Sequence, residues 1–193
     1  LETGQTNNIV WTVNEDGLLT ITGAGNYELV EYVEDEDYSY YETPWYKYRN
    51  VITAAKVSVT EITSVKGMFS DCYSLQEVDF SASDFSKVTD ASDLFSYGAI
   101  STIKCPIGVN IDIALPNSNY GWYQEDNKTA PFYEMLPRGL TKSVTLNKAK
   151  ASSFPEDENL LVEGKSGDLN WKIDLNGKLT ITGTGNYELQ DME

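Results

Sequence analysis

Val57-Ser58-Val59, Val78-Asp79-Phe80 and Ile103-Lys104-Cys105 are the three segments of the sequence that decide the fold. Each reads apolar, polar, apolar, so a strand formed there would bury one face and expose the other. Their first residues are 21 and 25 positions apart (78 − 57 and 103 − 78). We therefore interpret each segment as the strand of one repeating unit.

A second pattern lies between these strands. The apolar residues of Ile62-x-x-Val65-x-x-Met68-Phe69 recur 26 positions later in Val88-x-x-Ala91-x-x-Leu94-Phe95. Spacings of three and four are typical of a helix, so each unit is predicted to be a strand, a link, a short helical turn and a return. So small a unit must stack on its neighbours to bury its apolar face. The predicted class is α/β and strand-rich, a short parallel solenoid of about three strands over residues 51–106.

The sequence motif at the start of the chain is repeated near its end. Residues 8–22 are predicted to form a hairpin, because alternating apolar residues flank Asp16-Gly17. Twelve of the nineteen residues at 171–189 are identical to those at 11–29, at an offset of 160. The chain is thus interpreted as one full unit followed by the opening hairpin of a second, over residues 168–193. A lone hairpin is marginal in water, so this one is expected to pack on the first unit or on a neighbouring molecule.

Residues 1–50 are predicted to form an N-terminal hairpin and an acidic, aromatic cap. Seven of the thirteen tyrosines lie within residues 27–48. Thr43 and Pro44 are expected to start a short helix that buries its aromatic face. One interpretation is a lid over the first open unit. The alternative is an aromatic platform for a glycan or a protein, whose candidates are Tyr38, Tyr40 and Tyr41.

The end of the first unit is predicted to be an antiparallel β cap over residues 107–150. It contains Trp122 and Tyr123, which are either core residues or further binding candidates. Residues 151–167 read as a polar connector. The apolar alternation of residues 109–113 and 144–146 supplies the expected strands of the cap.

Charge and composition exclude several functions. The chain has 14 Lys and Arg against 30 Asp and Glu, a net charge of −16, so nucleic acid and anionic membrane surfaces are poor partners. It has no histidine, which removes the commonest general base and metal ligand. Asp35 and Asp37 are weak calcium candidates, because the central glycine of a calcium loop is missing. Cys72 and Cys105 are expected to be buried thiols. No cofactor, no membrane-inserting segment and no catalytic residue is predicted.

Three motifs together resemble the BspA-type leucine-rich-repeat surface proteins of bacteria. Trp11…Asp16-Gly17-x-Leu19-Thr20-Ile21-Thr22-Gly23-x-Gly25 resembles the opening hairpin of that family. Met68-Phe69-Ser70-x-Cys72-x-Ser74-Leu75-x-x-Val78-Asp79-Phe80 resembles its repeat. Trp122-Tyr123…Leu136-Pro137-x-Gly139-Leu140 resembles its closing β segment. The resemblance implies a leucine-rich-repeat-like solenoid on an exported, extracellular, cell-surface protein, with adhesion or partner binding as its role.

The function expected from the sequence is therefore that of a non-catalytic module that binds a host or bacterial surface protein or a glycan. Self-association through the second hairpin is a further expectation. One alternative is a carbohydrate-active enzyme, which would need two carboxylates about 5–10 Å apart in a cleft. Another is a purely structural spacer in a tandem array.

Overall fold

The computed structural model describes residues 2–33, 39–116, 121–125, 133–148, 160–166, 168–174 and 178–184. Within these ranges the chain forms thirteen strands in three sheets and one short 3₁₀ helix, η1 (Tyr46–Tyr48). The strand-rich part of the expectation is confirmed, whereas no α-helix occurs in the described residues. No helix in the described residues is long and apolar enough to cross a membrane.

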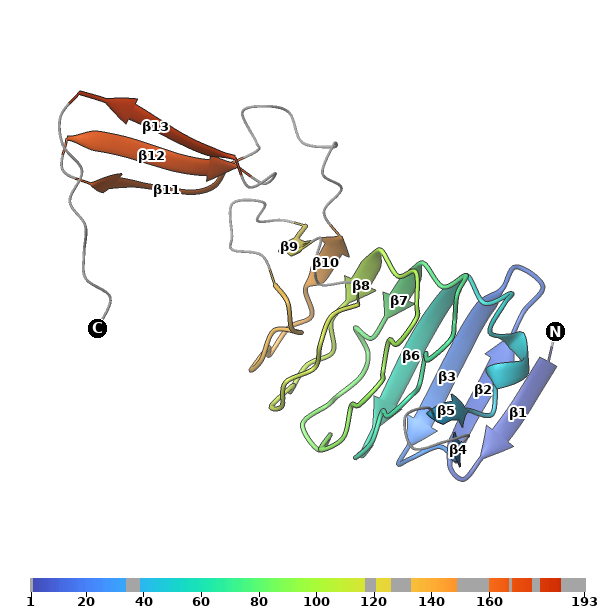
Figure 1. Cartoon of the computed structure of the whole chain (residues 1–193). Coiled ribbons are helices and arrows are strands. Elements are labelled where there is room, and N and C mark those ends of the chain that lie inside the picture. The colour runs from blue at the N-terminus through green and yellow to red at the C-terminus, as the bar shows by residue number, and fades with distance from the viewer. Residues whose placement is uncertain are drawn as a thin grey trace.

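The largest sheet has eight strands, in the order β1-β2-β3-β6-β7-β8-β10-β9 (Figure 1). The neighbours β3, β6, β7 and β8 pair in parallel, and the pairs at both ends of the sheet are antiparallel. The hairpin predicted near the N-terminus is present, and β1 extends it by a strand that the sequence did not indicate. The bounds are β1 (Glu2–Thr6), β2 (Ile9–Val13), β3 (Leu18–Ala24), β6 (Ala54–Thr60), β7 (Glu77–Asp79), β8 (Thr102–Lys104), β9 (Trp122–Gln124) and β10 (Thr145–Lys148).

A row of apolar side chains crosses the inner face of this sheet, and we call it the inner row. Its members are paired from strand to strand and are all buried. Five of the eight strands, β3, β6, β7, β8 and β10, thus contribute one aliphatic group each to a continuous line inside the molecule. The inner row consists of Leu19, Ala55, Val78, Ile103 and Leu146.

The register of β6 differs from the interval seen in the sequence. Ala55, not Val57, pairs with Val78, so the first interval is 23 residues (78 − 55) and not 21. The second interval, from Val78 to Ile103, is the predicted 25. The difference arises because β6 has seven residues and begins three residues before Val57, where it pairs along the full length of β3.

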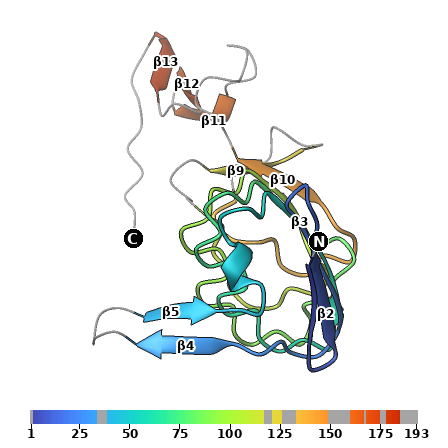
Figure 2. The same cartoon turned by 90° about the vertical axis from the view of Figure 1, so that its right-hand side faces the viewer.

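The links between the parallel strands are hydrogen-bonded turns, so the prediction of helical turns there is wrong. The turns still repeat at the predicted offset of 26. The rings of Phe69 and Phe95 stack with centroids 6.4 Å apart and planes 8° apart. The Phe69 N–H donates to the carbonyl of Leu94 at 3.0 Å, and the Asp71 N–H donates to that of Ser96 at 3.0 Å. Spacings of three and four here reflect which residues of a tight turn face the core. Figure 2 shows the turns returning on the side opposite the sheet.

Aromatic residues close the N-terminal end of the core. Trp45 is fully buried, donates from its indole N–H to the carbonyl of Met68 at 2.9 Å, and contacts the ring of Tyr27. The predicted helix from Pro44 is only the 3₁₀ turn η1, and no side-chain hydrogen bond caps it. The acidic segment before it contains a small hairpin of β4 (Val30–Val33) and β5 (Ser39–Glu42), which projects from the turn side (Figure 2).

The other end of the sheet is antiparallel, as predicted. β10 pairs with β8 on one side and with β9 on the other. Residues 109–113, whose alternation suggested a strand, form none, although Val109 and Ile113 are buried in the core. The alternation therefore reports burial and not strand pairing at this place.

A separate three-stranded sheet contains the second copy of the opening motif (Figure 1). It consists of β11 (Leu160–Ser166), β12 (Leu169–Asp174) and β13 (Leu179–Gly183). Leu179 and Ile181 remain 55% and 57% exposed. Of the two alternatives expected for this hairpin, packing on the first unit is therefore wrong, and packing on a neighbouring molecule stays a prediction.

Both cysteines are free and buried, as expected. Burial raises the pKa of the Cys72 thiol and that of the Cys105 thiol to about 12. Neither thiol forms a thiolate readily at neutral pH, so both act as small core residues.

The buried thiols give a first prediction. A chromogenic disulfide reagent at about pH 8 should leave the native protein unmodified and should titrate both thiols after denaturation. Val51→Cys is the matched control, because Val51 is exposed and its thiol should react in the native state. Fast reaction of either natural cysteine in the native protein would contradict the burial described above.

The stacked turns give a second prediction. Phe69→Ala removes a fully buried ring that contacts Phe80 and Phe95. Denaturant unfolding should show a loss of about 3–5 kcal/mol of stability. Tyr97→Ala, at a ring that is 71% exposed, should change stability by less than about 0.5 kcal/mol. Equal effects of the two substitutions would show that the turns do not share one core.

Candidate binding face

The eight-stranded sheet presents polar side chains on the face opposite the inner row, and we call this the outer face. Alternation along each strand produces it, because every second residue points away from the core. The side chains of its middle are exposed or half-buried. From β3 to β9 the outer face consists of Thr20, Thr22, Lys56, Ser58, Glu77, Asp79, Thr102, Lys104, Thr145, Asn147 and Tyr123.

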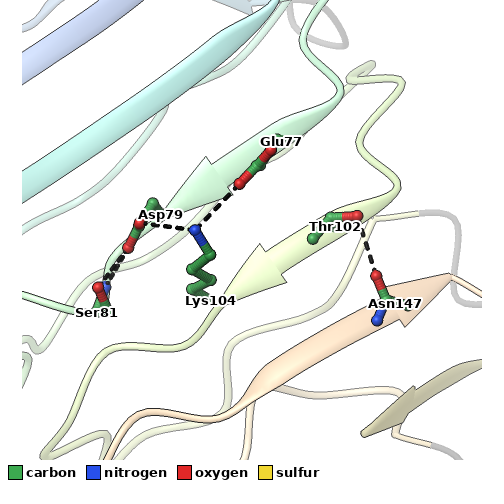
Figure 3. Close-up of polar contacts among 6 residues, drawn as sticks. All are labelled: Glu77, Asp79, Ser81, Thr102, Lys104 and Asn147. Atoms are coloured by element: carbon green, nitrogen blue, oxygen red, sulfur yellow. Dashed lines mark hydrogen bonds and ion pairs between the residues drawn. The ribbon is translucent and has the colours of Figure 1, made fainter. Parts of the chain in front are cut away.

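Charged residues alternate in sign across the middle of the outer face. Lys56 pairs with Asp79, and Asp79 pairs with Lys104, on three successive parallel strands. The ammonium group of Lys104 lies 3.0 Å from a carboxylate oxygen of Asp79 and 3.3 Å from one of Glu77 (Figure 3). Opposite charges at such cross-strand positions stabilise the pairing. With Lys56 the four charges sum to zero, although the whole chain carries −16.

Asp79 is held in its ionised form. Partial burial raises the pKa of this carboxyl, but hydrogen bonds from Ser81 and from Lys104 outweigh that effect and leave the pKa below its usual value. The Ser81 N–H donates to Asp79 Oδ1 at 2.9 Å, and the Ser81 hydroxyl donates to the same oxygen (Figure 3). The hydrogen bonds that the Lys104 ammonium group donates to Asp79 and Glu77 raise the pKa of Lys104. The pair is therefore fixed in position and charge.

The C-terminal part of the outer face is neutral. The hydroxyl of Thr102 lies 3.1 Å from the side-chain oxygen of Asn147 (Figure 3). Asn147 in turn pairs with Tyr123 across β10 and β9. Tyr123, a binding candidate from the sequence, is half-buried here and belongs to the outer face.

Two other binding candidates are core residues. Trp122 is fully buried and donates its indole N–H to the carbonyl of Pro116 at 3.0 Å. Tyr41 is buried as well, and its hydroxyl donates to Asp93 Oδ2 at 3.1 Å. A binding platform needs exposed rings, and neither ring lies on the surface. Trp122 and Tyr41 are therefore buried residues of the fold, which was the other interpretation of the sequence.

The remaining candidates cannot be placed on a surface. Tyr38, Asp35 and Asp37 lie outside the described residues. The backbone of Tyr40 is part of β5, and its side chain lies outside the described part of the structure. Among the described residues, no three His, Cys, Asp or Glu side chains gather as a metal site would require.

Sequence reasoning did not single out Lys56, Asp79 and Lys104 as a cluster. A signal for Asp79 and Lys104 was present, because each is the polar middle residue of an apolar-polar-apolar segment. Their juxtaposition depends on the register, and the sequence interval misplaced β6 by two residues.

Two pockets lined by described residues are open depressions near the two ends of the sheet. One of 500 Å³ lies at the edge near Glu125 and Thr141, and one of 380 Å³ lies between Asp16 and Tyr48. The described carboxyls with a resolved shift, Glu2, Asp79 and Asp90, all have a lowered pKa.

Comparison with known proteins gives one distant structural likeness. No protein-family model matches the sequence, and no curated protein matches it. The chain is similar to a leucine-rich repeat protein from Eubacterium ventriosum of known crystal structure, with 20% sequence identity and a TM-score of 0.32. The match covers 64% of this chain and 48% of that one, so the chain matches less than half the length of that protein. A likeness at this TM-score does not establish a shared fold.

The Asp79 cluster gives a pH-dependent prediction. A carboxyl whose pKa is lower in the folded protein than in the unfolded chain stabilises the fold above the unfolded pKa, and this contribution is lost as the pH falls through the folded pKa. Asp79→Asn should therefore lower the free energy of unfolding by about 1 kcal/mol at neutral pH. The difference from the parent protein should shrink as the pH falls below the ordinary carboxyl range and should be lost below the lowered pKa of folded Asp79.

Denaturant titrations at several pH values measure this difference. Glu125→Gln, at an exposed position next to the edge strand β9, is the matched control and should leave stability within about 0.5 kcal/mol of the parent. A deficit of Asp79→Asn that stays constant down to pH 2 would show that its cause is not the ionised carboxylate.

Proposed function

We propose that this chain is a leucine-rich-repeat-like solenoid of the BspA type. In this proposal it is a non-catalytic module of an exported bacterial cell-surface protein, and it binds a surface protein through the outer face. A glycan is the alternative ligand. The observation that carries the proposal is the row Lys56–Asp79–Lys104, which lies open in the middle of a continuous sheet.

The stacking of the turns supports the solenoid part of the proposal. Units of 23 and 25 residues add one parallel strand each, and their inner-row side chains lie side by side. Such stacking of supersecondary units is the general property of repeat proteins, which use the resulting extended surface for binding. The motifs quoted from the sequence support the finer assignment to the BspA type.

The chemistry of the outer face suits a polar protein partner. It combines balanced charges with hydroxyl and amide groups, which form the directional contacts that give specificity. Eight strands at a spacing of ~4.8 Å make the sheet roughly 34 Å wide. Because the middle strands β7 and β8 have only three residues each, about 10 Å in length, the face they form offers less than the ~800 Å² per partner of a standard interface. A single module is therefore expected to bind weakly, and tandem modules would gain strength through effective concentration.

Two observations favour binding over catalysis. The pocket near Glu125 and the pocket between Asp16 and Tyr48 are open rather than enclosed, whereas substrate sites are concave and bury most of their ligand. Among the described residues, the carboxyls of Glu2, Asp79 and Asp90 are stabilised in the charged form by neighbouring groups of the chain, whereas a general acid needs a raised pKa.

The proposal predicts a ligand whose binding depends on the outer face. The purified chain is applied to an array of secreted host proteins, to bacterial surface proteins and to a glycan array, and each hit is retested in solution. Lys56→Glu and Tyr123→Ala should each weaken binding at least about tenfold. Lys172→Glu makes the same charge change at an exposed position of β12 and should have no effect.

The outcomes separate the alternatives. Binding to a protein that Lys56→Glu weakens supports the proposal, and a glycan hit with the same dependence replaces the protein by a glycan. Binding that neither outer-face substitution changes would overturn the assignment of the outer face. An absence of any ligand would favour the structural spacer.

A further inference from the structure

The three-stranded sheet of β11, β12 and β13 repeats β1, β2 and β3 residue by residue in its pairing. Gly4 pairs with Trp11, and Gly164 pairs with Trp171. Further pairs match at the same offset of 160. Among them are Thr6 with Ile9 and Ser166 with Leu169, Ile9 with Gly23 and Leu169 with Gly183, and Val13 with Leu19 and Ile173 with Leu179.

The backbone repeats as well. Gly23 and Gly183 have positive φ angles of 138° and 123°. A Cβ atom at Gly23 would lie 2.0 Å from the carbonyl oxygen of Asn8, and one at Gly183 would lie 2.6 Å from that of Asp168. Each glycine therefore permits the same close approach of two strands, so the two copies share one local structure.

The two copies differ in what covers their apolar face. Leu19 and Ile21 of the first copy are fully buried. Their equivalents Leu179 and Ile181 are 55% and 57% exposed. Because sequence, register and backbone agree, the difference lies in the missing cover and not in the sheet itself.

The first copy shows what the cover is. β6 pairs in parallel with β3 along seven positions, from Leu18–Ala54 to Ala24–Thr60. The aromatic turn that precedes β6 lies against the same face, with the ring of Tyr48 6.1 Å from that of Trp11. The Thr53 N–H donates to the carbonyl of Gly17 at 2.9 Å and joins this turn to the hairpin. Residues 43–60 thus supply both a strand for the edge and apolar groups for the face.

We propose that β11–β13 is a docking surface for one polypeptide segment with the pattern of residues 43–60, an aromatic turn followed by a parallel strand that pairs with the edge of β13. The inward residues of the segment, equivalent to Ala55, Val57 and Val59, would lie beside Leu179 and Ile181 in the same sheet. Residues 43–60 of another copy of this chain are not the occupant, because they are already buried against their own β1–β3. This docking surface is independent of the outer face and of its ligand.

A synthetic peptide of residues 43–60 tests the proposal on the full chain. Fluorescence anisotropy of the labelled peptide should show saturable binding at one peptide per chain. Ile181→Asp places a charge on the docking face and should weaken binding at least about tenfold. Lys172→Asp changes a side chain of the same sheet that is not part of this face and should leave binding unchanged. A peptide with aspartate at Val57 and Val59 should not bind.

Disulfide trapping tests the register and does not depend on the folding of the Ile181→Asp variant. Thr22 pairs with Ser58 in the first copy, so Thr182 should face the Ser58 position of the peptide. With oxidised glutathione as oxidant, the chain with Thr182→Cys should cross-link to the peptide with Ser58→Cys. The chain with Thr180→Cys, two residues out of register, should cross-link much less. The natural cysteines are buried and serve as the internal control.

Three results would overturn the proposal. The first is no binding of the peptide to the full chain. The second is equal cross-linking at Thr180→Cys and Thr182→Cys, which would indicate non-specific contact. The third is sedimentation that shows a dimer of the chain whose formation excludes the peptide, since the face would then bind a second copy.

Discussion

The structure depends on burial of the inner row by stacking. β7 and β8 have only three residues each, and neither contributes more than a few inward side chains. Val78 is buried because Ala55 and Ile103 lie on either side of it, and the phenylalanine stack closes the same unit from the turn side. At ~25 cal/mol per Å² of apolar surface, no such unit offsets its own chain entropy. The units are therefore stable only together, and register is fixed by the side chains that must meet.

The outer face follows from the same constraint. Once Ala55, Val78 and Ile103 are in line, the next residues of their strands must also be in line on the opposite side. This places Lys56, Asp79 and Lys104 in one row. The alternation of charge in that row adds cross-strand attraction between neighbouring strands. Packing inside thus determines the chemistry presented outside.

The sequence predicted the features that depend on local alternation and failed where a longer-range contact decides. The hairpin around Asp16-Gly17, the antiparallel end of the sheet and the burial of both cysteines followed from residue types. The turns around Phe69 were mistaken for helices, since a tight turn that buries every third or fourth residue has the same apolar spacing. The sequence did not decide whether Trp122 is a core residue or a binding residue, because an indole side chain suits both roles. The row of Lys56, Asp79 and Lys104 on the outer face was not predicted, because the register of β6 must be known before these three residues can be aligned.

The second copy of the opening motif shows that sequence alone does not complete such a unit. Its strands pair in the same register as those of the first copy, which means that local pattern and turn chemistry suffice to form the sheet. They do not suffice to bury it. Fully burying a leucine or isoleucine contributes about 1.5–3 kcal/mol, and Leu179 and Ile181 each lack more than half of the burial that Leu19 and Ile21 have. The burial that holds β6 against β3 is therefore still available at β13. It favours binding of a parallel strand whose inward apolar residues lie beside Leu179 and Ile181.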